Sequence, residues 1–331
     1  MKCNIFFLLL LALSCVLTLL IGDIPFEGVW NKTIERLQGI TAEWNPLLDE
    51  RLPRLIILIC TGASLAVAGA VLQSLFQNPL ASPSILGISS GGSLAVVLIF
   101  ILQLHLLHPL VLPLSAVGGS FLILGVVYGL TIMQGGAPLN NLILTGIAIS
   151  TLLIAFQSFL LYTFRDHWQL IQTIAEWEVG STIDRSWQHV HMQLPLTIIG
   201  LLGCLAYRKE MNVMALGEEE AKNLGVNVEK VRWRLFLCVA LLVGGSLAAL
   251  GMIAFFGLVL PHIARRLQGT DHRKLIPLCI VAGAAVLTSL DVMLRLFNLT
   301  NLSLGSLSAI GGGIFFILLL FKSQRRSTCR I

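Results

Sequence analysis

Long apolar runs recur along the whole of the 331-residue sequence. Each run has roughly 17–25 residues, the length that crosses a bilayer as a helix. Because lipid offers no partners to backbone N–H and C=O groups, each run has to satisfy its own backbone as a helix. We expect spans near residues 3–22, 55–76, 84–104, 109–132, 139–162, 192–208, 234–253, 255–267, 275–297 and 305–321. The sequence therefore predicts an all-α, polytopic membrane protein with about ten transmembrane helices, in a single transmembrane domain over residues 1–331.

Two of the predicted spans depart from a plain transmembrane helix. The run at 255–267 is too short to cross, and Pro261 interrupts it, so we expect a broken or tilted element there. The first run follows only Lys2. It is long for the apolar part of a signal peptide and has no clear small-x-small cleavage site, so we expect a retained helix.

The placement of charge indicates the orientation of the chain. Only 12% of the residues are Asp, Glu, Lys or Arg. Ten spans put both termini on one side, together with segments 208–234 and 265–274, and that side carries most of the 22 Lys and Arg residues. Loops rich in Lys and Arg stay in the cytoplasm. We therefore expect a multi-pass protein of the cytoplasmic (inner) membrane with both termini in the cytoplasm.

The opposite side carries two larger loops, at about 23–54 and 163–191. Their tryptophans suit the membrane interface, and we expect a short surface helix in the second loop.

Ionisable residues are nearly absent from the predicted spans. Asp291 and Arg295 lie four residues apart on the ninth span, where they can neutralise each other. His262 lies beside the predicted break. An ion-coupled carrier needs an ionisable site near the membrane midplane, so the pattern argues against a secondary transporter, which stays an alternative together with a channel. A permease for bare Zn²⁺ or Mn²⁺ would favour His and carboxylate ligands along the path, and the predicted spans hold almost none.

The absence of an ATP-binding motif and of paired cysteines also bears on the predicted function. No GxxxxGK[ST] motif occurs, so a transporter driven by ATP would need a separate ATPase subunit. The seven cysteines are scattered without a CxxC pair, which favours buried apolar fillers over metal ligands or disulfides. We predict no catalytic residue, no cofactor, no metal site and no nucleic-acid partner. Membrane lipid is the expected surrounding.

One compact charged segment, "ALGEEEAKNLGV" at 215–226, interrupts the apolar sequence. Small and apolar residues recur in and after it at spacings of three and four, typical of one helix face. They are Gly217, Ala221, Leu224, Val228 and Val231. Gly225 is expected to end the first of two short helices. We expect a cytoplasmic knob at about 209–232 that fits a groove on a soluble partner, with a solvated loop as the alternative.

Several stretches, in order along the chain, resemble the FecCD family, the membrane subunits of ABC importers for iron–siderophore complexes, haem and vitamin B12. They are "RLPRL" (51–55), "GASLAVAGAVLQSLFQNPLASPSILGISSGGSLA" (62–95), "LILTGIAIS" (142–150), "ALGEEEAKNLGV" (215–226), "FFGLVLPHIARRLQGTDHRKLIP" (255–277) and "GAAVLTSLDVMLR" (283–295). The stretch at 255–277 is the most specific. Ferric-siderophore members fit best, with haem and cobalamin importers as alternatives.

The resemblance implies a type II ABC importer permease fold. It also implies a translocation path at the interface with a second permease copy or a paralogue, and an extracytoplasmic substrate-binding protein. A cytoplasmic ABC ATPase dimer would dock on the coupling segment. The coupling residues carried over by resemblance are Leu216, Gly217, Glu218, Ala221, Leu224 and Gly225.

The family also implies a use for three arginines. Arginines at the positions of Arg51, Arg54 and Arg295 meet glutamates on the binding protein in the family. Arg forms bidentate bonds with carboxylates. The alternative is that all three are interfacial anchors, or that Arg295 serves only Asp291.

Two prolines mark a candidate part of the path. Pro79 and Pro83 predict irregular backbone at 77–87. We hypothesise that this segment lies near the cytoplasmic end of the path, against the alternative of a plain tight loop. The path and gate candidates are Gln73, Asn78, Pro79, Ser82, Pro83, Gly87, Pro261 and His262.

The sequence departs from the family pattern at two places. "NLSLG" (301–305) stands where the family has a turn like Glu-Leu-Pro-Val-Gly, and "GMIAF" (251–255) stands where it often has Gly-Pro-x-x-Phe. These departures leave the geometry of the local gate and outer loop undetermined by the resemblance.

Overall fold

The computed structural model describes residues 2–22, 26–40, 43–133, 139–183, 185–299 and 302–328, and the regular secondary structure of these residues is helical throughout. Long helices occupy each predicted span. They are α1 (Lys2–Leu20), α3 (Leu52–Leu75), α4 (Ile88–Ile101), α5 (Val111–Met133), α6 (Leu139–Thr163), α8 (Trp187–Ala206), α11 (Val228–Leu250), α12 (Phe256–Gln268), α13 (His272–Leu296) and α14 (Leu304–Thr328). Among the described residues, six helices are long and apolar enough to cross a membrane by length and composition, and α1, α4 and α14 contain shorter apolar segments.

Shorter helices connect these elements. They are α2 (Phe26–Leu37), α7 (Trp168–Glu178), α9 (Arg208–Met214) and α10 (Glu218–Asn223), with single turns η1 (Pro46–Arg51), η2 (Pro83–Leu86) and η3 (Leu104–Leu106). Helix α7 is the short helix expected in the loop at 163–191.

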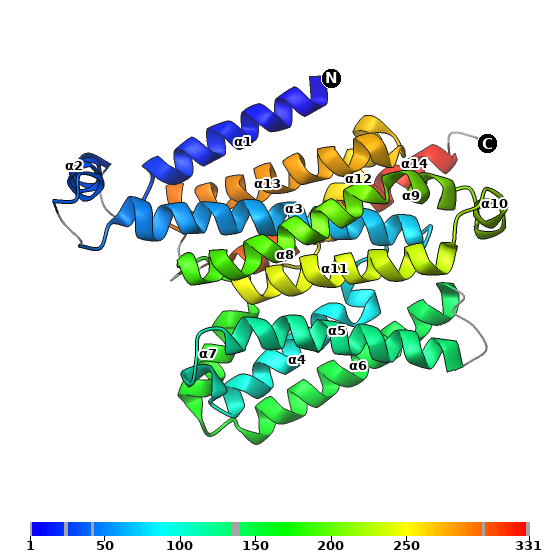
Figure 1. Cartoon of the computed structure of the whole chain (residues 1–331), viewed down its shortest axis with the longest axis horizontal. Coiled ribbons are helices and arrows are strands. Elements are labelled where there is room, and N and C mark those ends of the chain that lie inside the picture. Colours follow the sequence, from blue (N-terminus) through cyan, green and yellow to red (C-terminus); the bar gives the residue numbers. More distant parts are fainter. Residues whose placement is uncertain are drawn as a thin grey trace.

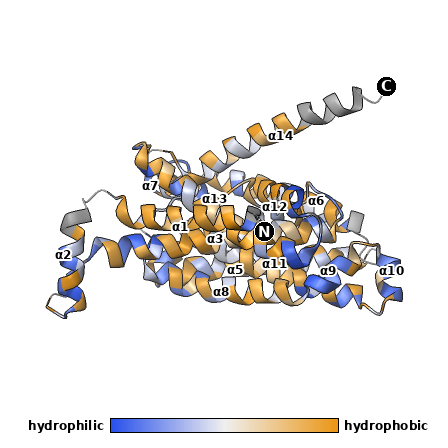
Figure 2. Cartoon of the chain, turned by 90° about the horizontal axis from the view of Figure 1, so that it is seen from above, coloured by the Kyte–Doolittle hydropathy of each residue, from blue (hydrophilic) through white to orange (hydrophobic). Residues whose placement is uncertain are grey.

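The long helices run roughly side by side, with α3 in the middle of the bundle (Figure 1). Helix α13 packs on α3 and carries α1 on its other side, while α8 and α11 cover another face of α3. Helices α4, α5 and α6 form a second group, joined to the first through α11. In the view of Figure 2, α14 projects away from the bundle and α10 is a hydrophilic end.

Helix α3 can occupy the centre because glycines let neighbouring backbones approach it. A Cβ added to Gly62 would lie 2.3 Å from the carbonyl oxygen of Gly283 on α13, and one added to Gly69 would lie 1.6 Å from that of Gly257 on α12. Such small-residue contacts are the usual means of close helix packing in membranes. The small residues of 62–73 are therefore packing positions.

Pro261 does not break its helix, which corrects the expectation of an interruption at that residue. The irregular backbone lies earlier, at 251–255, where Phe255 has a φ of 60°, and α12 continues through Pro261. Proline cannot donate to the carbonyl of the residue four positions before it, here Gly257. That carbonyl lies against Gly69 of α3, so a neighbouring helix packs where the helical donor is missing.

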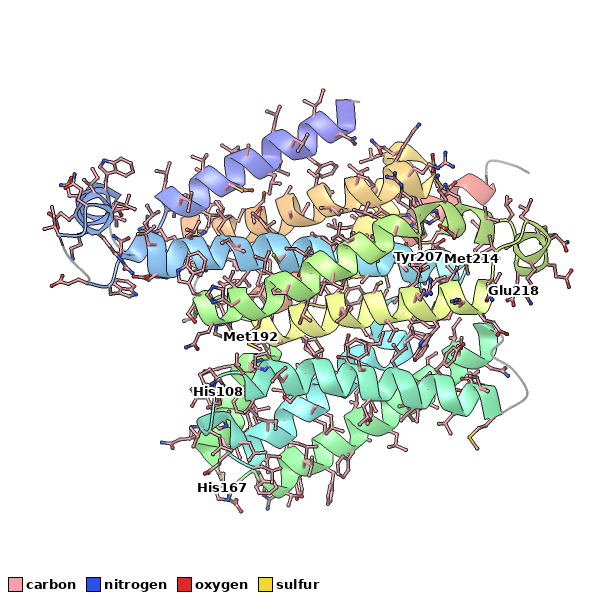
Figure 3. The ribbon with its side chains drawn as sticks, viewed as in Figure 1. His108, His167, Met192, Tyr207, Met214 and Glu218 are labelled. Atoms are coloured by element: carbon pink, nitrogen blue, oxygen red, sulfur yellow. The ribbon has the colours of Figure 1, made fainter. Side chains whose placement is uncertain are left out.

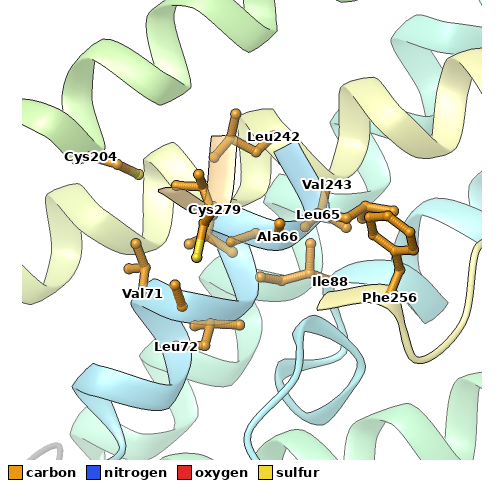
Figure 4. Packing of buried hydrophobic residues seen from close by; sticks show 14 of the residues in the cluster. Leu65, Ala66, Val71, Leu72, Ile88, Cys204, Leu242, Val243, Phe256 and Cys279 are labelled. Atoms are coloured by element: carbon orange, nitrogen blue, oxygen red, sulfur yellow. The ribbon is translucent and has the colours of Figure 1, made fainter. Parts of the chain in front are cut away.

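The hydrophobic core joins residues from most of the long helices (Figure 4). Leu72 of α3, Ile88 of α4, Leu242 of α11 and Phe256 of α12 belong to one buried cluster. The side chains of Cys60, Cys204 and Cys279 are buried, as expected of small apolar fillers. Cys3 and Cys329 lie outside the side chains that the structure describes.

Candidate functional site

The charged segment forms a compact projection at one end of the molecule, which we call the knob (residues 207–227). It contains α9 and α10 and connects α8 to α11. Figure 3 shows Tyr207, Met214 and Glu218 following one another from the end of α8 into the knob. The loops that hold α2 and α7 lie at the opposite end (Figure 1).

Helix α10 begins and ends at glycines with positive φ. Gly217, with a φ of 130°, precedes the helix, and Gly225, with a φ of 82°, follows it. The Gly225 N–H donates to Lys222 O at 2.9 Å and the Val226 N–H to Ala221 O at 3.0 Å. These two bonds define a Schellman motif. The predicted helix end at Gly225 is thus confirmed.

Ion pairs fix α10 on the start of α11. Glu218 accepts from the buried Arg232 at 2.7 Å and from Lys222 at 3.1 Å. Partial burial raises the pKa of the Glu218 carboxyl, but the bonds from Arg232 and Lys222 outweigh it and hold the pKa below its usual value. Glu218 therefore stabilises the knob in its charged form.

Three of the five residues of the predicted stripe face the inside of the protein, which corrects the interpretation of the whole stripe as a partner surface. Ala221 is 0% exposed, and Val228 and Val231 are also buried. Leu224, also on the stripe, is 64% exposed, and Leu216, outside the stripe, is 66% exposed. The reason is that the three buried residues pack α10 on the end of the bundle.

The knob is bonded to two core helices by residues that the sequence analysis did not single out. Asn212 donates to Asp271 at 2.7 Å and accepts from the backbone N–H of His272 at 2.8 Å, at the start of α13. Gln77, after the end of α3, donates to Met214 O at 3.3 Å. The one sequence signal for these contacts is Asp271, a typical helix N-cap residue, which accepts from Arg273 N.

The segment 77–87 has the irregular backbone predicted from its prolines. Pro79 lies in a turn, Pro83 begins η2, and Gly87 has a φ of 75°. Asn78 accepts from Leu80 N at 2.9 Å, and Ser82 bonds Ser84 at 2.8 Å. A role of this segment in the path stays a prediction.

The other path candidates make contacts between helices. Gln73 on α3 donates to Leu258 O at 3.1 Å and accepts from Arg265 at 2.8 Å, so it joins α3 to α12. His262, also on α12, lies edge-on to Phe315 of α14, with ring centroids 5.9 Å apart. These contacts account for packing and leave the predicted role in the path untested.

Three arginines lie close together at the end opposite the knob, and two of them, Arg54 and Arg295, pair with a buried carboxylate. Asp291 of α13 is 0% exposed and forms ion pairs of 2.8 Å with both Arg54 and Arg295. Thr182, in the loop after α7, also donates to Asp291, at 3.0 Å. The predicted pairing of Asp291 with Arg295 is confirmed, and Arg54 is the partner that the sequence did not indicate.

Two of these arginines also cap helix α1. Arg51 donates to Leu19 O at 2.8 Å, and Arg295 donates to Ile21 O at 2.7 Å and Thr18 O at 3.2 Å. The last carbonyls of a helix have no partner within it and carry partial negative charge. The arginines therefore join α1 to α3 and α13.

The arginine cluster lines a cavity of about 1300 Å³, whose wall also includes Arg185 and Glu50. The side chain of Arg51 is almost fully buried, and those of Arg54 and Arg295 are 15% and 10% exposed. In this arrangement the arginines serve contacts within the chain. Docking of a binding protein through them stays a prediction.

The apolar helix bundle, with a polar knob at one end and an arginine-lined cavity at the other, is that of a polytopic membrane permease. The FecCD transport family model matches residues 8–322. The hemin transport system permease protein HmuU of Yersinia pestis is 36% identical, over 92% of this chain and 90% of that protein. The Fe(3+) dicitrate transport system permease protein FecD of Escherichia coli is 35% identical, over 97% and 98%. The vitamin B12 import system permease protein BtuC of Vibrio parahaemolyticus is 37% identical, over 95% and 92%.

A solved structure agrees with these relatives. A metal-chelate type ABC transporter in an inward-facing conformation matches with a TM-score of 0.83 and 28% identity, covering 97% of this chain and 99% of that chain. The chain therefore belongs to the FecCD transport family. It is a permease subunit of an ABC importer of the group that serves iron–siderophore complexes, haem and vitamin B12.

Proposed function

We propose that this permease carries an iron complex, a ferric siderophore, across the cytoplasmic membrane. Relatives named for ferric dicitrate and hemin transport support an iron complex. The relative named for vitamin B12 import makes cobalamin the second candidate. The carboxylate of Asp291 is buried and paired with two arginines, so it is not available to a bare metal ion. That argues for a chelated cargo.

The test is uptake by cells that lack their own permeases of this kind. Cells that express the chain with its ATPase and binding protein receive labelled ferric dicitrate, a ferric hydroxamate, hemin or cobalamin. We expect accumulation of a ferric chelate. Accumulation of cobalamin alone would overturn the proposed substrate but not the transport class.

We further propose that the knob is cytoplasmic and docks a separate ATPase subunit. Leu216 and Leu224 are exposed apolar side chains beside the exposed carboxylates of Glu219 and Glu220. Interfaces typically combine apolar anchors with a polar rim. The bonds of Asn212 and Gln77 give the knob direct connections to α13 and α3. Force applied to the knob would reach the bundle through these contacts.

Variants of the knob separate docking from folding. Leu216→Asp with Leu224→Asp should abolish co-purification of the ATPase subunit while the chain still elutes as one folded species. Glu229→Gln, at the exposed start of α11 and outside this surface, is the control and should keep the ATPase. Ala221→Glu should instead disrupt the knob itself, because Ala221 is buried. Unchanged ATPase affinity in the double Leu variant would contradict the docking surface.

We propose that a second permease copy or a paralogue packs against α6 and α14. Only 11% of the 18-residue apolar stretch of α6 is buried within the chain. Helix α14 extends from the bundle (Figure 2). A cysteine introduced at the exposed Ser158 of α6 should form cross-linked dimers in membranes, and one at Leu202 of α8 should not. Dimers formed equally at both positions would contradict this interface.

A further inference from the structure

Two cysteines lie near the base of the knob, where the end of α8 packs against the middle of α11. Cys204 lies two residues before the end of α8, and Cys238 lies on the facing side of α11. The sulfur of Cys238 lies against the backbone of Gly203, the residue before Cys204. Cys204 is buried and points inward from α8 (Figure 4), and Cys238 is half-buried. The chain between them contains the whole knob.

Glycines bring the two helices this close. A Cβ added to Gly203 would lie 2.4 Å from Cys238 Sγ, and one added to Gly200 would lie 3.1 Å from Cys238 O. Without side chains at these positions, the sulfur of Cys238 packs on the backbone beside Cys204. This approach places the backbone of α8 beside Cys204 close to Cys238 of α11, and a disulfide requires closely spaced Cα atoms.

A polar contact lies close to the thiols on the knob side. The guanidinium of Arg234 donates to the hydroxyl of Tyr207 and lies 5.8 Å from the ring centroid. Tyr207 directly follows α8, and Arg234 is one helical turn from Cys238. The two helices are thus already held together at this point, which keeps the thiols in register.

We propose that Cys204 and Cys238 form an oxidation-sensitive lock at the base of the knob. A peroxide converts one thiolate to a sulfenic acid and leaves as water, and the second thiol then attacks that sulfur and releases another water. The sum is two thiols and one hydrogen peroxide giving one disulfide and two waters. The disulfide closes a loop that contains α9 and α10, which restricts the motion of the knob relative to the bundle.

The first test examines the thiols alone and does not depend on the proposed function. The full chain is purified in detergent with the other five cysteines replaced, and it is treated with hydrogen peroxide. We expect the intact mass to fall by two hydrogens and maleimide labelling after denaturation to fall from two thiols to none. Dithiothreitol should restore both.

Control variants distinguish a close pair from independent thiols. Phenylarsine oxide, which binds two neighbouring thiols with loss of water, should bind once per chain and should not bind Cys204→Ser or Cys238→Ser. Two free thiols after peroxide treatment would overturn the lock. Failure to bind the arsenical would overturn the pairing.

The second test measures the effect on the knob, and its ATPase readout rests on the proposed docking. Amide hydrogen exchange over 207–227 should slow severalfold in the oxidised chain. If the chain is oxidised, freed of peroxide and then assembled with its ATPase, ATP hydrolysis should fall severalfold and recover with dithiothreitol. Cys204→Ser treated in the same way should keep full hydrolysis. Unchanged exchange and hydrolysis in a fully disulfide-bonded chain would overturn the lock, whereas an ATPase that binds neither form would contradict only the docking.

Discussion

Helices α3 and α6 are both strongly apolar and long enough to cross a membrane, yet the fold uses them in opposite ways. Of the 18-residue apolar stretch that could cross a membrane, 89% is buried within the chain in α3, compared with 11% in α6. The difference lies in the size of the side chains. The middle of α3 reads "GASLAVAGAV" (62–71), whereas α6 carries "TLLIAFQSFLLY" (151–162). In lipid, hydropathy alone does not decide burial, because the tails are as apolar as Leu, so the helix that permits close approach becomes the core.

The contacts of α3 show how that burial is used. Its glycines meet the backbones of α12 and α13, while Thr61 accepts from Gln193 of α8 at 2.6 Å and Ser64 bonds Thr197 of α8 at 3.3 Å. The large residues of α6, such as Leu144 and Phe159, are more than half exposed. One helix organises the bundle, and the other presents an exposed apolar surface.

Among the variants proposed here, a bulky residue at Gly69 should have the largest effect on the burial of α3. In Gly69→Leu the added side chain meets the carbonyl of Gly257, so α12 has to move as a unit. We expect a cost at or above the roughly 1–3 kcal/mol of ordinary overpacking and almost no monodisperse protein by size-exclusion chromatography. Gly129→Leu on α5 is the matched control, since a Cβ there has open space. Equal yields would show that burial of α3 does not depend on backbone contact.

Removal of the buried carboxylate should be the next largest effect. Asp291→Ala leaves Arg54 and Arg295 without their counter-charge, and breaking a buried pair in this way costs about 3–5 kcal/mol. The melting temperature in detergent should fall markedly. Asp49→Ala is the comparison, because its pair with Arg36 is more exposed and exposed pairs contribute only about 0–1 kcal/mol. Equal shifts in the two variants would mean that the buried ion pairs of Asp291 stabilise the packing around α3 no more than an exposed ion pair does.

A smaller effect should follow from Thr61→Val, which keeps the shape of α3 and removes one acceptor. The amide of Gln193 then loses its partner in a buried site, at a cost of about 1–3 kcal/mol. The double variant with Gln193→Leu should regain much of the lost thermal stability, because both polar groups are then absent. Failure of the second change to restore stability would show that packing, not the hydrogen bond, is lost.

The smallest effect should come from α6. Leu152→Ala removes a side chain that is 64% exposed, and surface changes are usually within about 0.5 kcal/mol. The melting temperature of the protomer in detergent should hardly change. A large loss in detergent would show that α6 is already covered within one chain, which would remove its contrast with α3.

The sequence by itself determined the helical class, the ten elements and the turn at Gly225. These follow from local rules, since run length matches the bilayer and a positive φ favours glycine. The pairing of Asp291 with Arg295 was also predictable, because residues four apart share a helix face.

The tertiary structure alone decided which faces meet. It placed Arg54 beside Asp291, 237 residues away in sequence, turned Ala221 inward and left Leu216 and Leu224 exposed. Periodicity identifies a small or apolar stripe but not what covers it, because the same stripe can pack inside the chain or on a partner. Pro261 shows the same limit: the proline leaves the Gly257 carbonyl without its helical donor, and only the tertiary structure shows that Gly69 of another helix lies against it.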